Sequence, residues 1–198
     1  MRKDLSEMTL RELWQLFPII LKEHNPQYKE WYESEKTKIL KAVKPGNVAR
    51  INHIGSSTVE GLVSKPTVDI LLEVAAFCDI DELIDGLTSA GWGLMARKDE
   101  PMRLSFQKGY TPDGLSEKVF HLHVMLHGDW DELYFRDYLA AHPDVADEYG
   151  KLKLSLQKDF EHDRDGYTEA KTEFVTKYST IAKQEFRNKY KPKEIKSK

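Results

Sequence analysis

The sequence predicts a single α/β domain in which a mixed β-sheet is flanked by helices. Apolar residues recur at helical spacing near both ends of the chain, whereas the middle contains short segments of alternating apolar and polar residues. One predicted helix lies between two of these segments, which indicates a crossover and therefore a mixed sheet. The expected order is N-terminal helices (about 1–46), a sheet core (about 47–127), C-terminal helices (about 128–187) and a basic tail (188–198).

Two helical segments are predicted before the sheet. Residues 5–21 carry apolar side chains at three- and four-residue steps, and Pro18 is expected to bend or divide this segment. A second helical stripe covers residues 28–43 and ends at Pro45.

The middle of the chain contains five candidate strands. They are residues 48–54, 67–74, 92–96, 103–108 and 118–126. A helix that begins at a cap formed by Asp79 or Asp81 and ends at Gly91 is expected between the second and third strands. In the second strand, one face is predicted to enter the core and the other to carry Asp69, Leu71 and Glu73.

Beyond residue 129 the apolar spacing is helical again. The dipeptide His142-Pro143 separates the first predicted helix from the second, and Asp165-Gly166 separates the second from a third. The tail from residue 188 is rich in lysine and is expected to be solvated.

Composition limits the classes of function. The 198 residues include 30 basic and 33 acidic side chains, so the formal charge is -3 and no general attraction to nucleic acid is expected. An anion would need a local site. The single cysteine, Cys78, excludes an intramolecular disulfide and fits a reducing compartment, and no apolar segment is long enough to cross a membrane. A cytoplasmic location is therefore expected, whereas the oligomeric state is not predicted.

The first candidate site is a small-residue turn that follows a strand. Gly55 lets the backbone approach a phosphate, and the hydroxyls of Ser56 and Ser57 can donate hydrogen bonds to its oxygens. Asp69 lies in the middle of an otherwise apolar strand, where a carboxylate is costly to bury unless it is paired or bound to a cation. The alternative is structural: Gly55 makes a turn, and Asp69 caps a loop or pairs with Lys65.

The second candidate site is a divalent metal centre. Asp69 and Glu73 share one strand face, and His121 and His123 share one face of a later strand. If these strands are neighbours, carboxylates and imidazoles converge as metal ligands. The same residues are equally compatible with a hydrogen-bonded polar layer beneath the C-terminal helices.

Four basic residues are candidates for binding phosphate. They are Lys65, Arg103, Arg136 and Lys171. Arg103 and Arg136 have apolar or aromatic neighbours and could hold a phosphate through two parallel hydrogen bonds. Tyr167, Lys171 and Arg164 could form a lid, although most other basic side chains are expected to be solvated.

Several of these segments together resemble the GrpB family. The resemblance rests on residues 53–70 (HIGSSTVEGLVSKPTVDI), 120–124 (FHLHV), 133–139 (LYFRDYL), 149–153 (YGKLK) and 163–171 (DRDGYTEAK), which occur in the family's order. It extends from about the N-terminal helix to Ile181.

The resemblance implies a nucleotidyltransferase-like core followed by helices, in a family that is also found fused to dephospho-CoA kinase. In that superfamily the Gly-Ser turn holds a triphosphate, and two acids spaced by two residues bind magnesium. Gly55, Ser56 and Asp69 match this pattern, but Leu71 stands in place of the second acid.

Three functions are compatible with this departure. In the first, Asp69 with Glu73 or His123 rebuilds a Mg²⁺ site, and an NMP group is transferred to an acceptor, with Asp69 and His123 as catalytic residues. In the second, the protein binds a nucleotide or phosphorylated metabolite without turning it over. In the third, the helical part serves as an interaction scaffold.

Overall fold

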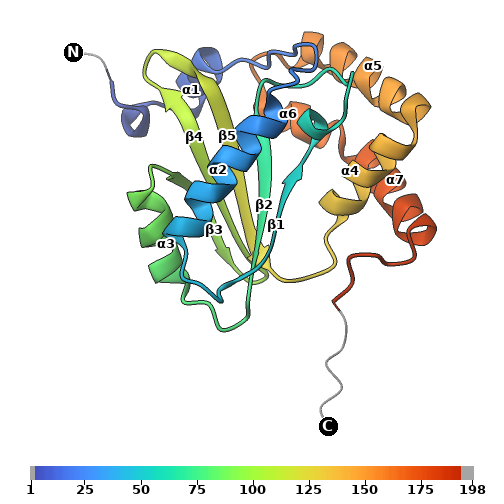
Figure 1. The fold of residues 1–198 in the computed structure, drawn as a ribbon. Helices are drawn as coiled ribbons and strands as arrows, with labels where there is room; N and C mark the ends of the chain where they lie inside the picture. The colour runs from blue at the N-terminus through green and yellow to red at the C-terminus, as the bar shows by residue number, and fades with distance from the viewer. Residues whose placement is uncertain (1–2, 193–198) are drawn as a thin grey trace.

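A five-stranded mixed sheet with helices on both faces forms the protein (Figure 1). The computed structural model describes residues 3–192. The strand order is β1-β2-β5-β4-β3, in which β2 and β5 are parallel and the other neighbours are antiparallel. This architecture confirms the predicted fold class.

The strands lie where alternation predicts them, and the last three are longer than predicted. They are β1 (Val48–Ile54), β2 (Val68–Val74), β3 (Gly93–Asp99), β4 (Met102–Thr111) and β5 (Gly114–Leu126). The segment 111–114, predicted to be a loop, is a tight hairpin whose two flanking residues still pair.

The N-terminal helical segment is divided more completely than predicted. A short 3₁₀ helix (Leu5–Glu7) precedes α1 (Leu10–Leu16), which ends at Phe17 because Pro18 cannot continue it. The helix α2 (Tyr28–Ala42) agrees with prediction, and α3 (Ile80–Ser89) is capped by the Asp79 carboxylate.

Four helices follow the sheet. They are α4 (Asp131–Ala141), α5 (Pro143–Asp159), α6 (Arg164–Glu169) and α7 (Thr172–Glu185). The third predicted helix is thus two helices, which are separated at Ala170 and Lys171.

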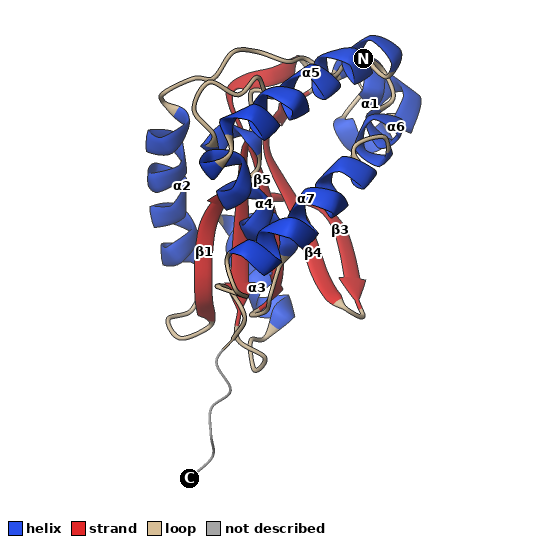
Figure 2. Ribbon diagram, turned by 90° about the vertical axis from the view of Figure 1, so that its right-hand side faces the viewer, coloured by secondary structure: helices blue, strands red, loops and turns tan. Residues whose placement is uncertain are grey.

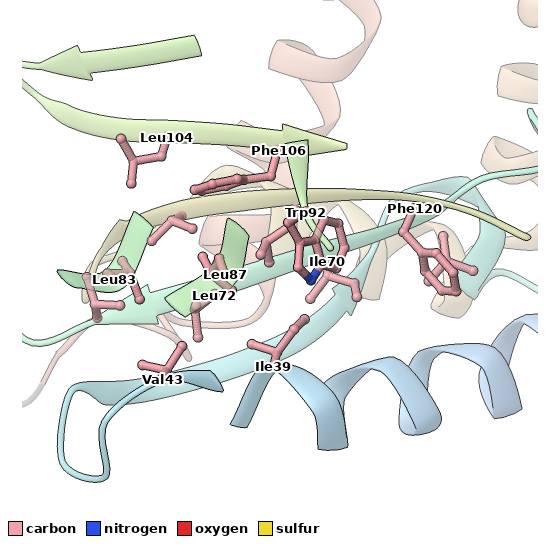
Figure 3. Close-up of a cluster of buried hydrophobic side chains, with 14 of the residues drawn as sticks. Ile39, Val43, Ile70, Leu72, Leu83, Leu87, Trp92, Leu104, Phe106 and Phe120 are labelled. Carbon is pink, nitrogen blue, oxygen red and sulfur yellow. The ribbon is translucent and has the colours of Figure 1, made fainter. Parts of the chain in front are cut away.

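One face of the sheet carries the main hydrophobic core. Side chains of α2 and α3, among them Ile39 and Leu87, pack against Ile70 and Leu72 of β2, with Trp92 filling the gap next to β4 and β5 (Figure 3). These residues show that alternate positions of β2 face α2 and α3, as predicted.

The opposite face of the sheet is covered by the C-terminal helices (Figure 2). At one end of this face, Leu71 is fully buried with Ile54, Met125 and Leu133 of α4. At the other end the helices do not close on the strands. The polar side chains that the strand pattern directs to this face therefore line a cavity.

The described part of the predicted tail, residues 188–192, is not fully solvated. The Tyr190 hydroxyl donates to Asp137 at 2.5 Å and accepts from Arg136 at 2.7 Å, and its ring packs on Tyr134. This aromatic anchor corrects the predicted start of the tail, and the remaining tail residues lie outside the described part. Within residues 3–192, every helix is too short or too polar to cross a bilayer.

Candidate functional site

The cavity has a volume of about 590 Å³ and lies between the polar end of the second sheet face and helices α5 and α6. Its main polar lining residues are Gly55, Ser56, Ser57, Lys65, Thr67, Asp69, Ser105, His121, His123, Lys153, Arg164, Asp165 and Lys171. The fold therefore brings together the predicted turn, the predicted carboxylate, both histidines and two of the predicted cations, Lys65 and Lys171.

The Gly55 turn lies directly against Asp69. Gly55 has φ of 74°, a conformation that favours glycine, and a Cβ atom at this position would lie 2.8 Å from Oδ2 of Asp69. A short 3₁₀ helix (Ser56–Thr58) follows the turn. The absence of a side chain is therefore what allows the turn and the carboxylate to share one wall of the cavity.

Asp69 belongs to a chain of hydrogen bonds that crosses the sheet. The strand register places Asp69 opposite His121, and Nδ1 of His121 lies 3.1 Å from Oδ1 of Asp69. Nε2 of His121 lies 2.7 Å from the Tyr110 hydroxyl, which accepts a hydrogen bond from Arg164 at 3.0 Å.

The directions in this chain follow from its ends. Arg164 can only donate and an ionised Asp69 can only accept, so Tyr110 donates to Nε2 and His121 donates from Nδ1. Both nitrogens of His121 are then occupied. Burial lowers the pKa of His121, which keeps the ring neutral. In spite of its own burial, Asp69 has a pKa well below its usual range, because His121 donates to the carboxylate and His123 lies close to it.

Four cationic side chains face the cavity, and none of them forms an ion pair with a described carboxylate. They are Lys65 in the loop before β2, Lys153 on α5, Arg164 on α6 and Lys171 between α6 and α7. Lys171 lies over the ring of Tyr167 at 4.1 Å, and Arg164 donates to the carbonyl of Phe17 at 3.1 Å.

Lys153 is the most buried of the four cations. Only 3% of its surface is exposed, and its ammonium donates to the hydroxyl of Ser56 at 3.0 Å and to the carbonyl of Val63. An ammonium has three donors, so one of them remains for a ligand. Lys153 thus links α5 to the turn that begins at Gly55.

Burial and repulsion between the cations lower the pKa values of the three lysines. Burial, with the nearby cations, lowers the pKa of Lys153 to about 7 and that of Lys171 to about 7. Burial also lowers the pKa of Lys65 to about 8, with a further contribution from Arg164. An anion in the cavity would offset both effects.

The structure corrects the predicted role of Glu73. Its side chain is fully buried, and it accepts hydrogen bonds from Arg50, one of them at 2.7 Å, and from the backbone N–H of Gly128 at 3.1 Å. Glu73 lies on the same strand face as Asp69, two residues beyond Leu71, and this places it outside the cavity. The carboxylate is therefore occupied by a structural ion pair.

The remaining predicted metal ligands do not complete a site. His121 has both ring nitrogens engaged, and His123, whose side chain is 32% exposed, lies 3.9 Å from Asp69. Among residues 3–192, no group of three His, Cys, Asp or Glu side chains is arranged to hold one metal ion. The donor set does not fit the predicted four-ligand Mg²⁺ centre.

Two predicted phosphate ligands also lie elsewhere. Arg103 points to the far end of the sheet, where it contacts Glu132 at 3.4 Å. Arg136 binds the carbonyl of His53 at 3.0 Å and the Asp137 carboxylate at 2.7 Å. Neither arginine lines the cavity: Arg103 contacts α4 through Glu132, and Arg136 contacts Asp137 and Tyr190.

Lys153 and Tyr110 were not predicted from the sequence to belong to the site, and neither were the lining residues Thr67, Ser105 and Asp165. The position of Lys153 could have been predicted from helical spacing, because it follows Tyr149 by four residues and so lies on the buried face of α5. Tyr110 follows a β-bulge at Gly109, where φ is 92°, so simple alternation along β4 does not predict its direction. Gly109 directly follows the predicted strand 103–108, whereas β4 continues through it to Thr111.

Comparisons with known proteins agree with this fold. Residues 18–180 match the family described as GrpB protein. A relative named "Glutamate-rich protein GrpB", from Alkalihalophilus pseudofirmus, is 32% identical over 79% of this chain and 91% of its own length.

Two further comparisons extend this result. The crystal structure of conserved protein GrpB from Enterococcus faecalis superposes with a TM-score of 0.72 and 27% identity, over 85% of this chain and 99% of that one. A protein named dephospho-CoA kinase, from Mycolicibacterium paratuberculosis, is 27% identical over 67% of this chain, which spans 38% of that longer protein.

Proposed function

This chain belongs to the GrpB family, and we propose that it binds a phosphorylated small molecule, a nucleotide among them, in the cavity beside the Gly55 turn. The observation that carries the proposal is the set of four cations without carboxylate partners, Lys65, Lys153, Arg164 and Lys171. Cations gathered at one place repel each other and lose hydration, so an anionic ligand would stabilise the arrangement.

The turn supports the same ligand chemistry. Ser56 and Ser57 follow Gly55 and line the cavity, so their hydroxyls and the nearby backbone N–H groups supply neutral donors beside the charged ones. Phosphate oxygens accept several hydrogen bonds at once, and arginine and lysine are their common charged partners. A cavity of about 590 Å³ accommodates a ligand of the size of a nucleotide.

Binding is favoured over NMP transfer. The transfer function requires acids that hold magnesium around the phosphates. Leu71 is fully buried among apolar side chains, and Glu73 is paired with Arg50, so Asp69 is the one carboxylate of β2 that faces the cavity. His123 is close enough to Asp69 to contact the same ligand, but among residues 3–192 no further His, Cys, Asp or Glu joins the two as a metal site.

The relative named dephospho-CoA kinase is consistent with a phosphorylated ligand. Because this chain spans only 38% of that protein, the kinase activity itself is not carried over.

The proposal also places the protein in the cytoplasm, where the free, buried Cys78 would remain reduced.

Isothermal titration calorimetry against a panel of ligands tests the proposal. The panel contains inorganic phosphate, pyrophosphate, AMP, ADP, ATP and dephospho-CoA, each titrated with and without Mg²⁺. We expect at least one phosphorylated compound to bind, and Lys153→Met to weaken its binding by tenfold or more. A loss of one charge-assisted contact, about 1.5 to 3 kcal/mol, corresponds to that change.

Lys151→Met is the matched control. Lys151 lies two residues earlier on the same helix and is exposed, so its substitution removes the same charge outside the cavity. Equal weakening by both substitutions would show a general effect of charge and contradict the site. If none of the ligands binds to folded protein, the scaffold function gains, and a pull-down from cell extract becomes the next experiment.

A further inference from the structure

We infer that the phosphoryl group of this ligand is held by side-chain cations and hydrogen-bond donors of the protein, without a divalent metal ion. The inference rests on the proposed function, because it concerns the same cavity. It assigns the neutralising role that magnesium has in many phosphate sites to Lys65, Lys153, Arg164 and Lys171.

Strand β2 offers magnesium a single carboxylate in this cavity, that of Asp69. Mg²⁺ takes oxygen ligands in octahedral geometry and is usually held by one or two carboxylates together with substrate phosphates. In this cavity Oδ1 of Asp69 already accepts from His121, so Oδ2, next to the Gly55 turn, is the one oxygen of this carboxylate that is left for a ligand. The next side chain on this strand face is the buried Leu71, so no second carboxylate can approach from β2.

The charge balance of the cavity also disfavours a bound cation. Four cationic side chains line the cavity, and only Asp69 and the exposed Asp165 oppose them. A divalent metal would add two positive charges where like charges already repel each other. A ligand with two or more negative charges, such as a phosphate monoester or a diphosphate, matches this balance directly.

Asp69 then has a different use, as a hydrogen-bond acceptor for the ligand. Arg164, Tyr110 and His121 act as positioning residues, because the chain of hydrogen bonds through them fixes one oxygen of the carboxylate. The other oxygen can accept from a hydroxyl group. The ligand class is therefore a phosphate ester that also carries a hydroxyl, as a ribose phosphate does.

Calorimetry of the full-length protein with ADP and pyrophosphate, in EDTA and in Mg²⁺, tests the inference. We expect dissociation constants that differ by less than about threefold between the two conditions. Binding that requires Mg²⁺, with a loss of tenfold or more in EDTA, would overturn the inference and leave the proposed function standing. If neither probe binds in either condition, this inference is overturned, and the proposed function stands only if another phosphorylated compound of the panel binds.

The Asp69→Asn variant gives a second test in which the two mechanisms predict opposite signs. A carboxylate that repels phosphate is removed, so pyrophosphate affinity in EDTA is expected to be unchanged or to rise by up to about tenfold. A metal-binding Asp69 would instead make this variant lose Mg²⁺-dependent binding. Asp165→Asn is the matched control, because it removes a charge at the same cavity from a side chain outside the hydrogen-bonded chain. Thermal unfolding checks that both variants fold.

Discussion

Nδ1 of His121 lies 3.1 Å from Oδ1 of Asp69, and this contact joins the only parallel pair of neighbouring strands in the described sheet. The carboxylate enters the cavity already oriented, with one oxygen occupied and the other held next to Gly55. Because the ring of His121 is fixed in turn by Tyr110, the orientation of Asp69 depends on residues that a ligand need not touch.

The Tyr110→Phe substitution tests this dependence. It removes the hydroxyl that joins Arg164 to His121 and leaves the ring that packs on Phe17. We expect a loss of about 1 kcal/mol in the free energy of unfolding, as for a typical hydrogen bond, and a several-fold weaker binding of ADP. Urea unfolding and calorimetry measure the two effects.

Tyr178→Phe serves as the control for Tyr110→Phe. Its hydroxyl donates to Glu148 at 3.1 Å on the far side of the C-terminal helices. The control should change stability by a similar amount and leave ADP binding unchanged. If Tyr110→Phe binds ADP as tightly as the wild-type protein, the hydrogen-bonded chain has no role in recognition.

Gly55→Ala is expected to disrupt the cavity through one contact. The new Cβ atom would lie 2.8 Å from Asp69, whereas Gly61, with φ of 75°, has no atom within 4 Å of the same position. Both substitutions place alanine at a positive φ, and Gly55, with ψ of -177°, lies in a region that is essentially restricted to glycine, so strain of about 1 to 3 kcal/mol adds to the contact. Gly55→Ala should therefore be less stable than Gly61→Ala and should alone lose ligand binding. Equal effects of the two substitutions on stability and binding would contradict the contact with Asp69.

Glu73→Gln separates structural importance from ligand binding. The buried carboxylate is paired with Arg50, and breaking a buried ion pair costs about 3 kcal/mol or more. Asp81→Asn, which breaks a pair with Arg97 at an aspartate side chain that is 80% exposed, should change the free energy of unfolding far less, because water screens an exposed pair. Neither variant should change ADP affinity at a temperature where both are folded. A specific loss of Mg²⁺-dependent binding in Glu73→Gln would restore Glu73 as a metal ligand.

The three lysines predict a pH dependence of stability and of binding. Their pKa values fall to about 7 for Lys153 and Lys171 and about 8 for Lys65, while the unfolded chain keeps the ordinary value of 10.5. Between pH 7 and 10 the unfolded chain therefore binds more protons, and the free protein should become more stable as pH rises.

Ligand binding should reverse this trend. A phosphate favours the ammonium form, so binding at pH 8.5 should take up about one to two protons, and affinity should fall as pH rises further. The other titratable and charged groups that line the cavity with the lysines are Arg164, Asp69, Asp165, His121, His123, Tyr149 and Tyr167. Calorimetry in buffers of different ionisation enthalpy measures the uptake, which should decrease in Lys153→Met. Binding without proton uptake at pH 8.5 would contradict the placement of the phosphate beside these lysines.

Much of the fold could be predicted because local patterns and tertiary structure agree. The alternation in β2 directs Ile70 to one helical layer and Leu71 to the other, and both are fully buried. The division at Pro18 was predicted from the proline itself, whereas the break at Ala170 was not. A helical stripe of apolar residues can continue in register across a short interruption, so periodicity does not reveal the interruption.

The site was predicted only in part because its members depend on pairing partners. Gly55 and Asp69 belong to one local segment and were found together. Arg136 and Lys153 are both basic residues of predicted C-terminal helices. In the structure Arg136 binds Asp137 and Tyr190, whereas Lys153 faces the cavity. The sequence shows that a cation is present, but a neighbouring acid or hydroxyl in space decides whether it is free for a ligand.

The Tyr190 anchor shows that the folding unit extends beyond its last helix. A shortened protein that ended at Glu185 would keep α7 and still lose the ring that lies against Arg50 and Tyr134. Arg136 would lose its hydrogen bond to the Tyr190 hydroxyl, and the Tyr134 hydroxyl would lose the backbone N–H of Tyr190 as a donor. A truncation placed at the end of α7 would therefore remove the Tyr190 segment, which contacts both β1 and α4. Without this segment the contact of α4 with the sheet would be weaker.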